Sequence, residues 1–406
     1  MTRRNLFAIP AGWTALAQSL QAQTANEAYW AMVARQFPLE PGLIYMNAAN
    51  VCPASRPVME RHLELLHDFH RNPSFQNRDK YAAMEERVRA KIAALLRATP
   101  DEIAMVRNTS EGSNLVVRGL DLKAGDEVVI TEHNHPSNND SWKVRAKRDG
   151  IVVKAMPVPV PAKSADELLT ALEAMLTPRT RVVAVTHVTN TAGLRFPVRE
   201  AGEIARRRNV WFHLDGAQSF GAIDVDLRAI GCDSYSASMH KWPMGPLEAG
   251  VLYVRAERQK ELWPSIVTAG WSDKLVGARK YEVFGQRDNP RLASLEAALD
   301  FLAMIGMPKI EMRVYELTNA LKKGFAADSR LILRTNVEPA LSHGVVKVDL
   351  KSGKRKEAYD TLWSKHRMAL ALTGGGDSAG IRFSPHIYNT MAEIETAVAA
   401  LKSVIG

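Results

Sequence analysis

The sequence predicts an α/β fold with a mostly parallel sheet, followed by a smaller α+β domain. From about residue 41 to 262, short apolar runs of strand length alternate with segments of helical periodicity. That pattern is typical of a parallel sheet covered by helices on both faces. After residue 263, two long helical segments precede several short strands and a last helix. The chain of 406 residues, 46% hydrophobic and 24% charged, is long enough for two globular domains.

Five apolar runs rich in β-branched residues predict buried strands of the larger domain. They are residues 126–131, 151–156, 181–188, 210–215 and 250–254. Between two of these runs, residues 197–209 predict a helix, because Val198, Ala201 and Ile204 fall on one face of a 3.6-residue repeat. Its arginines lie near the C-terminal end, where cations offset the helix dipole.

The smaller domain combines helices with short strands. Helices are predicted at residues 290–306, 310–327 and 390–406, and strands at 331–335, 345–350, 369–372 and 381–385. The order of these segments predicts an α+β unit.

The N-terminus begins with twin arginines, Arg3 and Arg4, followed by a weakly apolar stretch and small residues before Gln23. This resembles a twin-arginine export signal. We interpret residues 1–23 as that signal, 24–40 as an N-terminal arm, 41–262 as the large domain and 263–406 as the small domain. Export would make the protein periplasmic. The alternative is a terminal helix with two chance arginines on a cytoplasmic protein.

Composition excludes several classes of function. The two cysteines, Cys52 and Cys232, cannot form a disulfide framework or a cysteine-based metal site, and we predict no metal. The sequence contains no run of about 18 apolar residues, so we predict no membrane-spanning helix. The net charge of +9 is scattered, without a basic stripe interleaved with aromatics, so we expect no nucleic-acid partner. The absence of a G-x-G-x-x-G motif after a first strand counts against a nucleotide-dependent dehydrogenase.

Polar residues follow four predicted strands at the point where each strand ends: residues 126–131, 181–188 and 210–215, and a further predicted strand, CDSYSAS, at residues 232–238. The sequences are EHNHPSNND, TNTAG, DGAQS and MHKW, and a further segment, VRNTSEGSN, opens an apolar helix. Ligands of open α/β sheets bind beyond the carboxyl ends of the strands, and a helix N-terminus with hydroxyls suits a phosphate. Pyridoxal 5′-phosphate (PLP) needs an amine, a carboxylate, an anion site, hydrogen-bond donors and a flat side chain over its ring. These segments together supply all of those groups.

The block HLDGAQSFGAIDVD, with GCDSYSASMHKWPMGP after it, resembles the class V aminotransferase-fold enzymes, which are PLP-dependent and of fold type I. The resemblance runs over about residues 41 to 406. DGAQ, RDNPRLASLEAALDF and RFSPHIYNT are most similar to the isopenicillin N epimerase-like branch. The resemblance implies a seven-stranded sheet, a homodimer with active sites at the interface, and a small amino-acid substrate.

The resemblance also implies roles at the cofactor ring. Lys241 would form the aldimine with PLP and move the proton at the substrate's α-carbon. Asp215 would pair with the pyridinium nitrogen, and Gln218 and Asn190 would hydrogen-bond the phenolic oxygen. His135 would stack on the ring and steer protonation.

Further residues would hold the phosphate and the substrate. The implied phosphate contacts are Thr109, Ser110, Glu111 through its backbone N–H, Ser238 and His240. Arg382 would bind the α-carboxylate, because a guanidinium matches a carboxylate in a bidentate fashion. Asn47 is a candidate for a further substrate contact.

The chain departs from the family pattern at two places. Gln286 stands where the family often has a threonine that reaches the neighbouring subunit's phosphate, so that contact is an open question. Residues 371–383 lack the mobile cysteine that desulfurases carry before the arginine segment, which disfavours a persulfide-forming desulfurase. Epimerisation, transamination and β-elimination or C–S lysis stay open, with the epimerase-like reading leading. A non-catalytic PLP-fold sensor is disfavoured by the retained Lys241.

Overall fold

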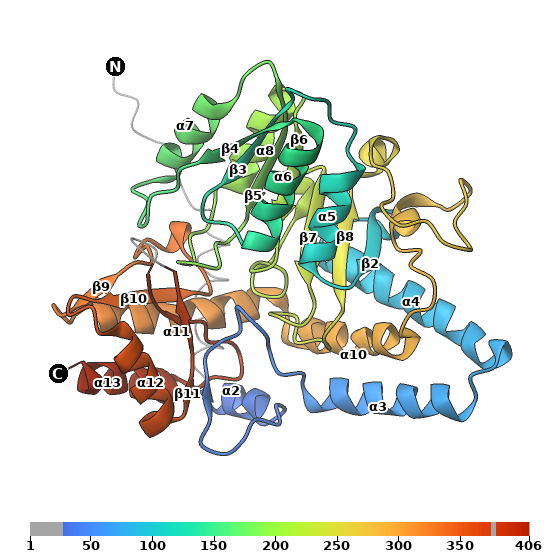
Figure 1. The fold of residues 1–406 in the computed structure, drawn as a ribbon. Coiled ribbons are helices and arrows are strands. Elements are labelled where there is room, and N and C mark those ends of the chain that lie inside the picture. Colours follow the sequence, from blue (N-terminus) through green and yellow to red (C-terminus); the bar gives the residue numbers. More distant parts are fainter. Residues whose placement is uncertain (1–26, 375–378, 406) are drawn as a thin grey trace, which may run out of the picture.

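The computed structural model describes residues 27–374 and 379–405. The predicted export signal, residues 1–23, therefore lies outside the described residues. Two hydrophobic cores organise the described chain: one around a seven-stranded sheet and one around a four-stranded sheet. Figure 1 shows the large sheet and its helices at the top and the C-terminal elements gathered at the lower left.

The large sheet has the strand order β2-β8-β7-β6-β5-β3-β4. All neighbouring pairs are parallel except the two made by β8, which runs antiparallel to β2 and β7. The predicted mostly parallel, seven-stranded sheet is confirmed. Its strands are β2 (Ile103–Val106), β3 (Glu127–Thr131), β4 (Val152–Met156), β5 (Thr180–Thr186), β6 (Trp211–Asp215), β7 (Ser234–Ser238) and β8 (Gly250–Val254).

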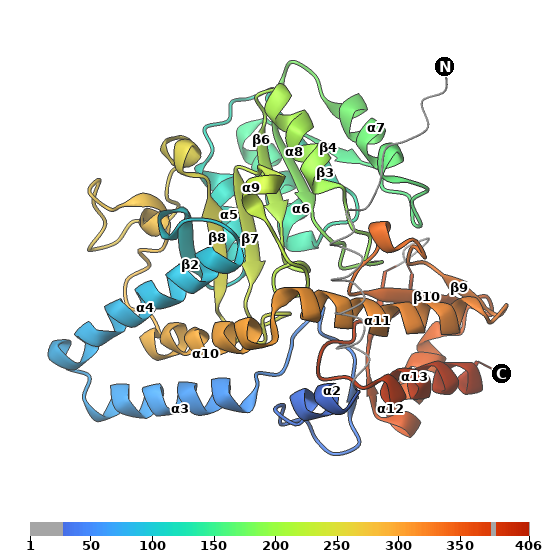
Figure 2. The ribbon, with the colours of Figure 1, turned by 180° about the vertical axis from the view of Figure 1, so that it is seen from behind.

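Helices cover both faces of this sheet because successive strand residues point to opposite sides. In β3, Val128 and Ile130 share a core with residues of α5 and α6, whereas Val129 faces the core formed with α4, α7, α8 and α9 (Figures 1 and 2). The helices are α4 (Phe75–Leu95), α5 (Thr109–Gly119), α6 (Pro136–Asp149), α7 (Ala165–Met175), α8 (Val198–Arg207) and α9 (Leu227–Ile230).

The second core lies between an antiparallel sheet of order β12-β13-β10-β9 and three C-terminal helices. The strands are β9 (Leu331–Leu333), β10 (Val346–Leu350), β12 (Ala371–Thr373) and β13 (Gly380–Phe383), and the helices are α11 (Met307–Ala326), α12 (Arg355–His366) and α13 (Met391–Val404). The expected α+β character of the C-terminal part agrees with this arrangement.

The boundary between the two cores differs from the expected division at residue 263. Helix α10 (Asn289–Ile305) packs along α3 (Arg56–Arg71) and α4, and α10 belongs to the large core (Figure 2). Within α11, Val314 belongs to the large core and Leu317 to the second one. At the other end, β1 (Ile44–Tyr45), which follows α2 (Glu27–Ala34), pairs with β11 (Met368–Ala369) of the C-terminal part. In the described part of the chain, no helix has the length and apolar character needed to cross a membrane.

Candidate active site

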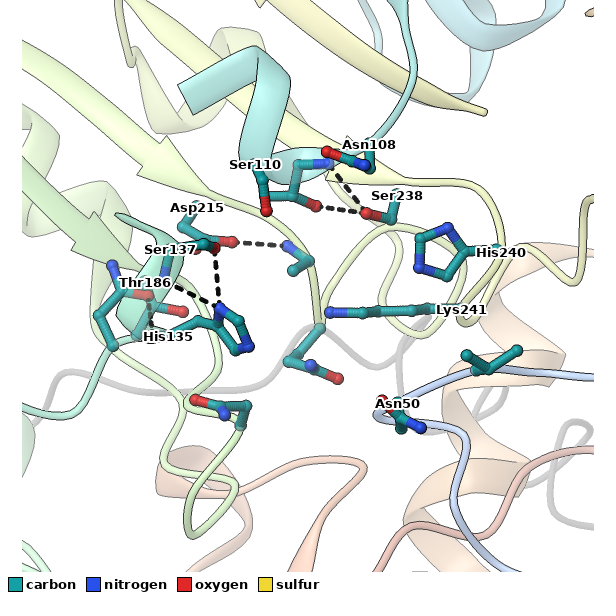
Figure 3. A pocket seen from close by; sticks show the side chains of 16 residues that line it. Asn50, Asn108, Ser110, His135, Ser137, Thr186, Asp215, Ser238, His240 and Lys241 are labelled. Atoms are coloured by element: carbon teal, nitrogen blue, oxygen red, sulfur yellow. Dashed lines mark hydrogen bonds between the residues drawn. The ribbon is translucent and has the colours of Figure 1, made fainter. Parts of the chain in front are cut away.

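A cavity of about 240 Å³ opens at the carboxyl ends of the parallel strands (Figure 3). It brings together nine residues that the sequence analysis singled out. They are Thr109, Ser110, His135, Asn190, Asp215, Gln218, Ser238, His240 and Lys241. The sheet topology explains the convergence, because the loops that follow parallel strands all emerge at the same edge.

Lys241 occupies the loop between β7 and β8. Figure 3 shows its side chain extending into the cavity, with its amine end towards the side on which Asp215 and His135 lie. Burial lowers the pKa of the Lys241 amine, while the negative charge of Asp215 works in the opposite direction. A desolvated amine carries its proton less tightly, which is the condition in which a lysine can attack a carbonyl group.

Asp215 is the last residue of β6 and is 2% exposed. Its Oδ1 accepts a hydrogen bond from the Ala217 N–H at 2.9 Å, and its Oδ2 accepts one from Asn138 Nδ2 at 3.4 Å. Burial raises the pKa of Asp215, and neither bond supplies a cation. A buried carboxylate without an ion-paired arginine or lysine in the described structure favours a ligand that brings a positive charge, such as a protonated ring nitrogen.

An anion site is built where α5 begins. The N–H of Thr109 donates to Ser238 Oγ at 2.9 Å, and the two hydroxyls of this pair lie 2.7 Å apart, so the helix start is fixed against the end of β7. The N–H of Ser110 at the helix start bonds to no other group in the described chain. Free N–H groups and the positive end of the helix dipole favour an anion at this position.

Of the predicted phosphate contacts, His240 lies in the cavity wall and Glu111 does not. His240 lines the cavity; its Nδ1 is buried without a hydrogen-bond partner in the described residues, and burial followed by the charge of Lys241 lowers its pKa to about 4. Glu111 does not line the cavity. Its N–H donates to Asn108 Oδ1 at 2.9 Å and its carboxylate pairs with Arg107, so the structure does not bring Glu111 to the anion site.

His135 caps the N-terminus of α6. Its Nδ1 accepts from the Ser137 N–H at 3.2 Å and lies 2.8 Å from Ser137 Oγ, which leaves Nε2 as the nitrogen that carries the proton. Burial, followed by the charge of Lys241, lowers the pKa of His135. The ring is therefore a neutral, oriented imidazole in the cavity wall. His133 lies outside this wall, with Nδ1 at 3.3 Å from Thr191 Oγ1.

Arg382 lies behind the cavity wall rather than in it. On β13, its guanidinium donates to the Asn190 carbonyl at 2.9 Å and to Asn47 Oδ1 at 3.0 Å. Burial lowers the pKa of Arg382 to about 10, and Nε has no hydrogen-bond partner in the described chain. No carboxylate in residues 27–374 or 379–405 forms an ion pair with this 6%-exposed arginine. A buried cation in that state favours an anionic ligand.

The family follows from the chain as a whole. Residues 44–396 match the model of the family described as aminotransferase class-V. The chain belongs to the class V aminotransferase family. Its curated relatives include an isopenicillin N epimerase of Amycolatopsis lactamdurans, 29% identical over 92% of this chain and 98% of the relative. A probable cysteine desulfurase of Methanothermobacter thermautotrophicus is also 29% identical, over 92% of this chain and 98% of the relative.

Solved structures share the fold. A cysteine desulfurase from Thermococcus onnurineus NA1 is 24% identical with a TM-score of 0.82, covering 91% of this chain and 96% of that one. A cystine C–S lyase in complex with its product cysteine persulfide is 24% identical with a TM-score of 0.83, covering 91% and 100%. The predicted family membership, the PLP fold type and the assignment as an enzyme are confirmed.

Class V aminotransferases use PLP, so the cofactor predicted from the strand ends is confirmed. The residues present fit this group: the start of α5 and the unpartnered His240 nitrogen suit its phosphate, and Asp215 suits its ring nitrogen. Lys241 offers the amine. In the described structure, the donor set of the cavity contains no group of acidic, cysteine and histidine side chains that could hold a metal ion.

Sequence reasoning missed several cavity residues: Asn50, Val51, Asn108, Asn134, Ser137, Thr186 and Ala217. Asn108 had a readable signal, because an asparagine before a helix is a typical N-cap. Asn50 and Val51 had none, since they reach the cavity from the N-terminal segment through tertiary packing. Gln286 lies on an exposed surface, where its Oε1 accepts from Arg78 Nη1 at 3.1 Å.

Proposed function

We propose that this enzyme acts at the α-carbon of an amino acid with a free carboxylate and that its reaction is epimerisation. The observation that carries the proposal is the convergence of a desolvated amine, a buried carboxylate and a neutral imidazole in one cavity, with an unpaired arginine behind its wall. The bound cofactor would serve as an electron sink for the negative charge left on the α-carbon.

This chain's own residues supply the proton transfers. Lys241 Nζ would accept the α-proton, because burial favours its neutral form. Epimerisation also needs a proton donor on the opposite side of the α-carbon, and we assign that role to Nε2 of His135 in its imidazolium form. The ring would take up a proton from solvent before the transfer and return to the neutral imidazole after it, while Lys241 would release the α-proton to solvent. Arg382, held by Asn47 and the Asn190 carbonyl, would bind the carboxylate and thereby fix the α-carbon between these groups.

Two findings together favour epimerisation over a persulfide-forming desulfurase. Two curated isopenicillin N epimerases align over nearly the full length of the chain. Cys52 and Cys232 are both buried, and burial raises the pKa of each thiol, so neither is the accessible thiolate that a persulfide-forming desulfurase requires. Cleavage of a carbon–sulfur bond is the second candidate, since β-elimination would use the same amine and carboxylate; one structural neighbour is described as a cystine C–S lyase.

The decisive experiment is turnover in deuterated water. The PLP-loaded enzyme is incubated with single L- and D-amino acids, cysteine derivatives and small peptides with a free amino-acid end. Epimerisation predicts deuterium at the α-carbon and appearance of the opposite enantiomer by chiral chromatography. Accumulation of a keto acid with pyridoxamine 5′-phosphate would contradict the proposal in favour of transamination. Loss of a β-substituent would contradict it in favour of lysis.

His135→Gln is expected to slow inversion by roughly 10²-fold. Deuterium exchange of one enantiomer without inversion should persist, because Lys241 still removes that proton. The matched control is His133→Gln, a change in the same loop outside the cavity wall, which should leave inversion within about twofold of the wild type. Equal losses of exchange and inversion in His135→Gln would contradict the two-group assignment.

Arg382→Lys is expected to raise the KM for the amino acid by roughly 10- to 100-fold with a smaller effect on kcat, because the bidentate contact to the carboxylate is lost. Steady-state kinetics measure the change. Arg313→Lys is the control, since Arg313 is also fully buried but pairs with Glu27 away from the cavity. That variant should lose thermal stability and keep its KM. An unchanged KM in Arg382→Lys would remove Arg382 from the carboxylate site.

We also propose that the enzyme is a homodimer and is exported. The cavity adjoins a surface depression through shared Asn108 and Ser110, and that depression continues to Gln286 through Arg107 and Ile266, so a second copy could close it. Sedimentation velocity tests the dimer.

Export rests on Arg3 and Arg4 and is tested by locating a reporter fused to residues 1–40, with and without both arginines changed to lysine.

A further inference from the structure

We infer that Trp242 is a positioning residue. Its indole fixes the carboxamide of Gln218 so that an N–H of the amide is available to the cavity, and its backbone connects Lys241 to the segment that carries Arg382. The inference rests on the proposed function in one respect, that PLP occupies the cavity. It concerns how this chain orients its own groups towards that cofactor.

Only one orientation of the Gln218 carboxamide satisfies its hydrogen-bond partners. Gln218 is 3% exposed and lines the cavity. Its Nε2 donates to the Ala49 carbonyl at 2.9 Å, and its Oε1 accepts from the Trp242 indole N–H at 2.8 Å. A carbonyl can only accept and an indole N–H can only donate. The flipped amide would therefore place oxygen against oxygen and N–H against N–H, with both groups buried and unpaired.

One hydrogen on Gln218 Nε2 remains after the bond to Ala49, because a carboxamide carries two donors. The oxygen of the side chain is occupied by Trp242. Gln218 can therefore offer the cavity a donor and has its acceptor turned away. A donor is the group that stabilises negative charge on the phenolic oxygen of the cofactor, whereas an acceptor there would repel it.

Residues from the C-terminal part of the chain also contact Trp242 and hold it in place. His386 Nε2 donates to the Trp242 carbonyl at 2.8 Å, and the two rings pack edge to face with centroids 5.0 Å apart. A Cβ added at Gly344 would lie 3.0 Å from the indole ring, so the glycine lets the backbone before β10 approach it. His386 follows Arg382 by four residues, and β13, which carries Arg382, pairs with β10.

The backbone around Lys241 is held on both sides. The His240 carbonyl accepts from the Cys52 N–H at 2.8 Å, and the Lys241 carbonyl accepts from the Met244 N–H at 2.8 Å. With His386 on the Trp242 carbonyl, three successive peptide groups are fixed. Trp242 thus links the backbone of Lys241, the amide of Gln218 and the loop after Arg382 in one hydrogen-bonded unit.

Trp242→Phe tests the inference, because phenylalanine keeps an aromatic ring and removes the N–H. Two readouts are measured without substrate: the dissociation constant of PLP from the cofactor-free protein, by fluorescence titration, and the pH midpoint of the visible band of the loaded protein. We expect PLP to bind roughly tenfold more weakly. The midpoint should move to higher pH, because a Gln218 amide that is no longer held in this orientation would offer its N–H less effectively to the phenolic oxygen, and that oxygen would then hold a proton more tightly.

Trp211→Phe is the matched control. Trp211 is 2% exposed and its indole N–H donates to Ser234 Oγ at 2.9 Å, outside the cavity wall. This variant loses an equivalent hydrogen bond, so we expect a similar fall in Tm with an unchanged midpoint. His386→Gln, which can still donate to the Trp242 carbonyl, should retain PLP affinity, and His386→Leu should lose it.

The outcomes separate the two proposals. If wild-type protein does not bind PLP, the proposed function fails. If wild-type protein binds PLP and Trp242→Phe matches Trp211→Phe in affinity and midpoint, the function stands and the positioning role of Trp242 is overturned. A shifted midpoint in Trp242→Phe alone supports the role, because a purely structural tryptophan would not change the ionisation of the cofactor.

Discussion

Lys241→Met is expected to lower turnover by at least about 10⁴-fold and to abolish covalent attachment of PLP. Methionine is a similar length but has no amine, so the variant loses both the group that binds the cofactor's aldehyde and the group that moves the α-proton. Borohydride reduction followed by peptide mass spectrometry measures the attachment directly: the wild type should carry the reduced cofactor on Lys241.

The matched control is Lys322→Met, another buried lysine. Lys322 is 2% exposed and donates to Ser342 Oγ at 2.9 Å, away from the cavity. Its loss should reduce Tm, while covalent attachment at Lys241 persists. Reduced cofactor on another lysine in the wild type would overturn the assignment of Lys241, whatever the activity of the variant.

Asp215→Asn is expected to have opposite effects on activity and stability. Turnover should fall by about 10²–10³-fold, because a neutral amide no longer stabilises the positive charge of the cofactor ring. The cofactor-free protein should gain stability on the order of 1 kcal/mol, or about 2 °C in Tm, because the variant no longer buries a charge.

The pH dependence of that gain follows from the direction of the pKa shift. Burial raises the pKa of Asp215 in the folded state above its unfolded value. Folding is therefore opposed by the ionised carboxylate, fully so above the folded pKa, and is unaffected below the unfolded pKa of about 3.9, where the carboxyl is neutral in both states. The stability difference between variant and wild type should thus be present at neutral pH and vanish as the pH falls towards 3.9.

Asp233→Asn separates this effect from a general response to burial. Burial also raises the pKa of Asp233, but this carboxylate has nearby cations, Arg255 at 3.4 Å and Arg258 at 3.5 Å. Its removal takes the carboxylate away from Arg255 and leaves Arg258 with Glu261 at 3.3 Å, so the variant should lose stability and keep its affinity for PLP. Calorimetry of both cofactor-free variants at pH 7 is the measurement. A loss of stability in Asp215→Asn would contradict the view that its charge is held for the ligand.

The helix and strand content and the central residues of the site could be predicted from the sequence. Asp215 ends a strand, Lys241 and His135 each follow one within a few residues, and a parallel sheet places such positions at one edge whatever the details of packing. The positions of these residues relative to the strands along the sequence therefore determined that they lie close together. Strand β2 was missed, because its four residues, Ile103–Val106, form an apolar run too short to show the periodicity of a strand.

Tertiary structure alone decided how these groups are oriented and what supports them. Arg382 meets Asn47 and Asn190 across 335 and 192 residues of sequence, and which of its nitrogens they occupy depends on the pairing of β13 with β10. Asn108 Oδ1 occupies the Glu111 N–H, and Trp242 sets the amide of Gln218. Sequence spacing specifies which residue types reach an edge, but hydrogen-bond direction and burial arise only when distant segments pack together.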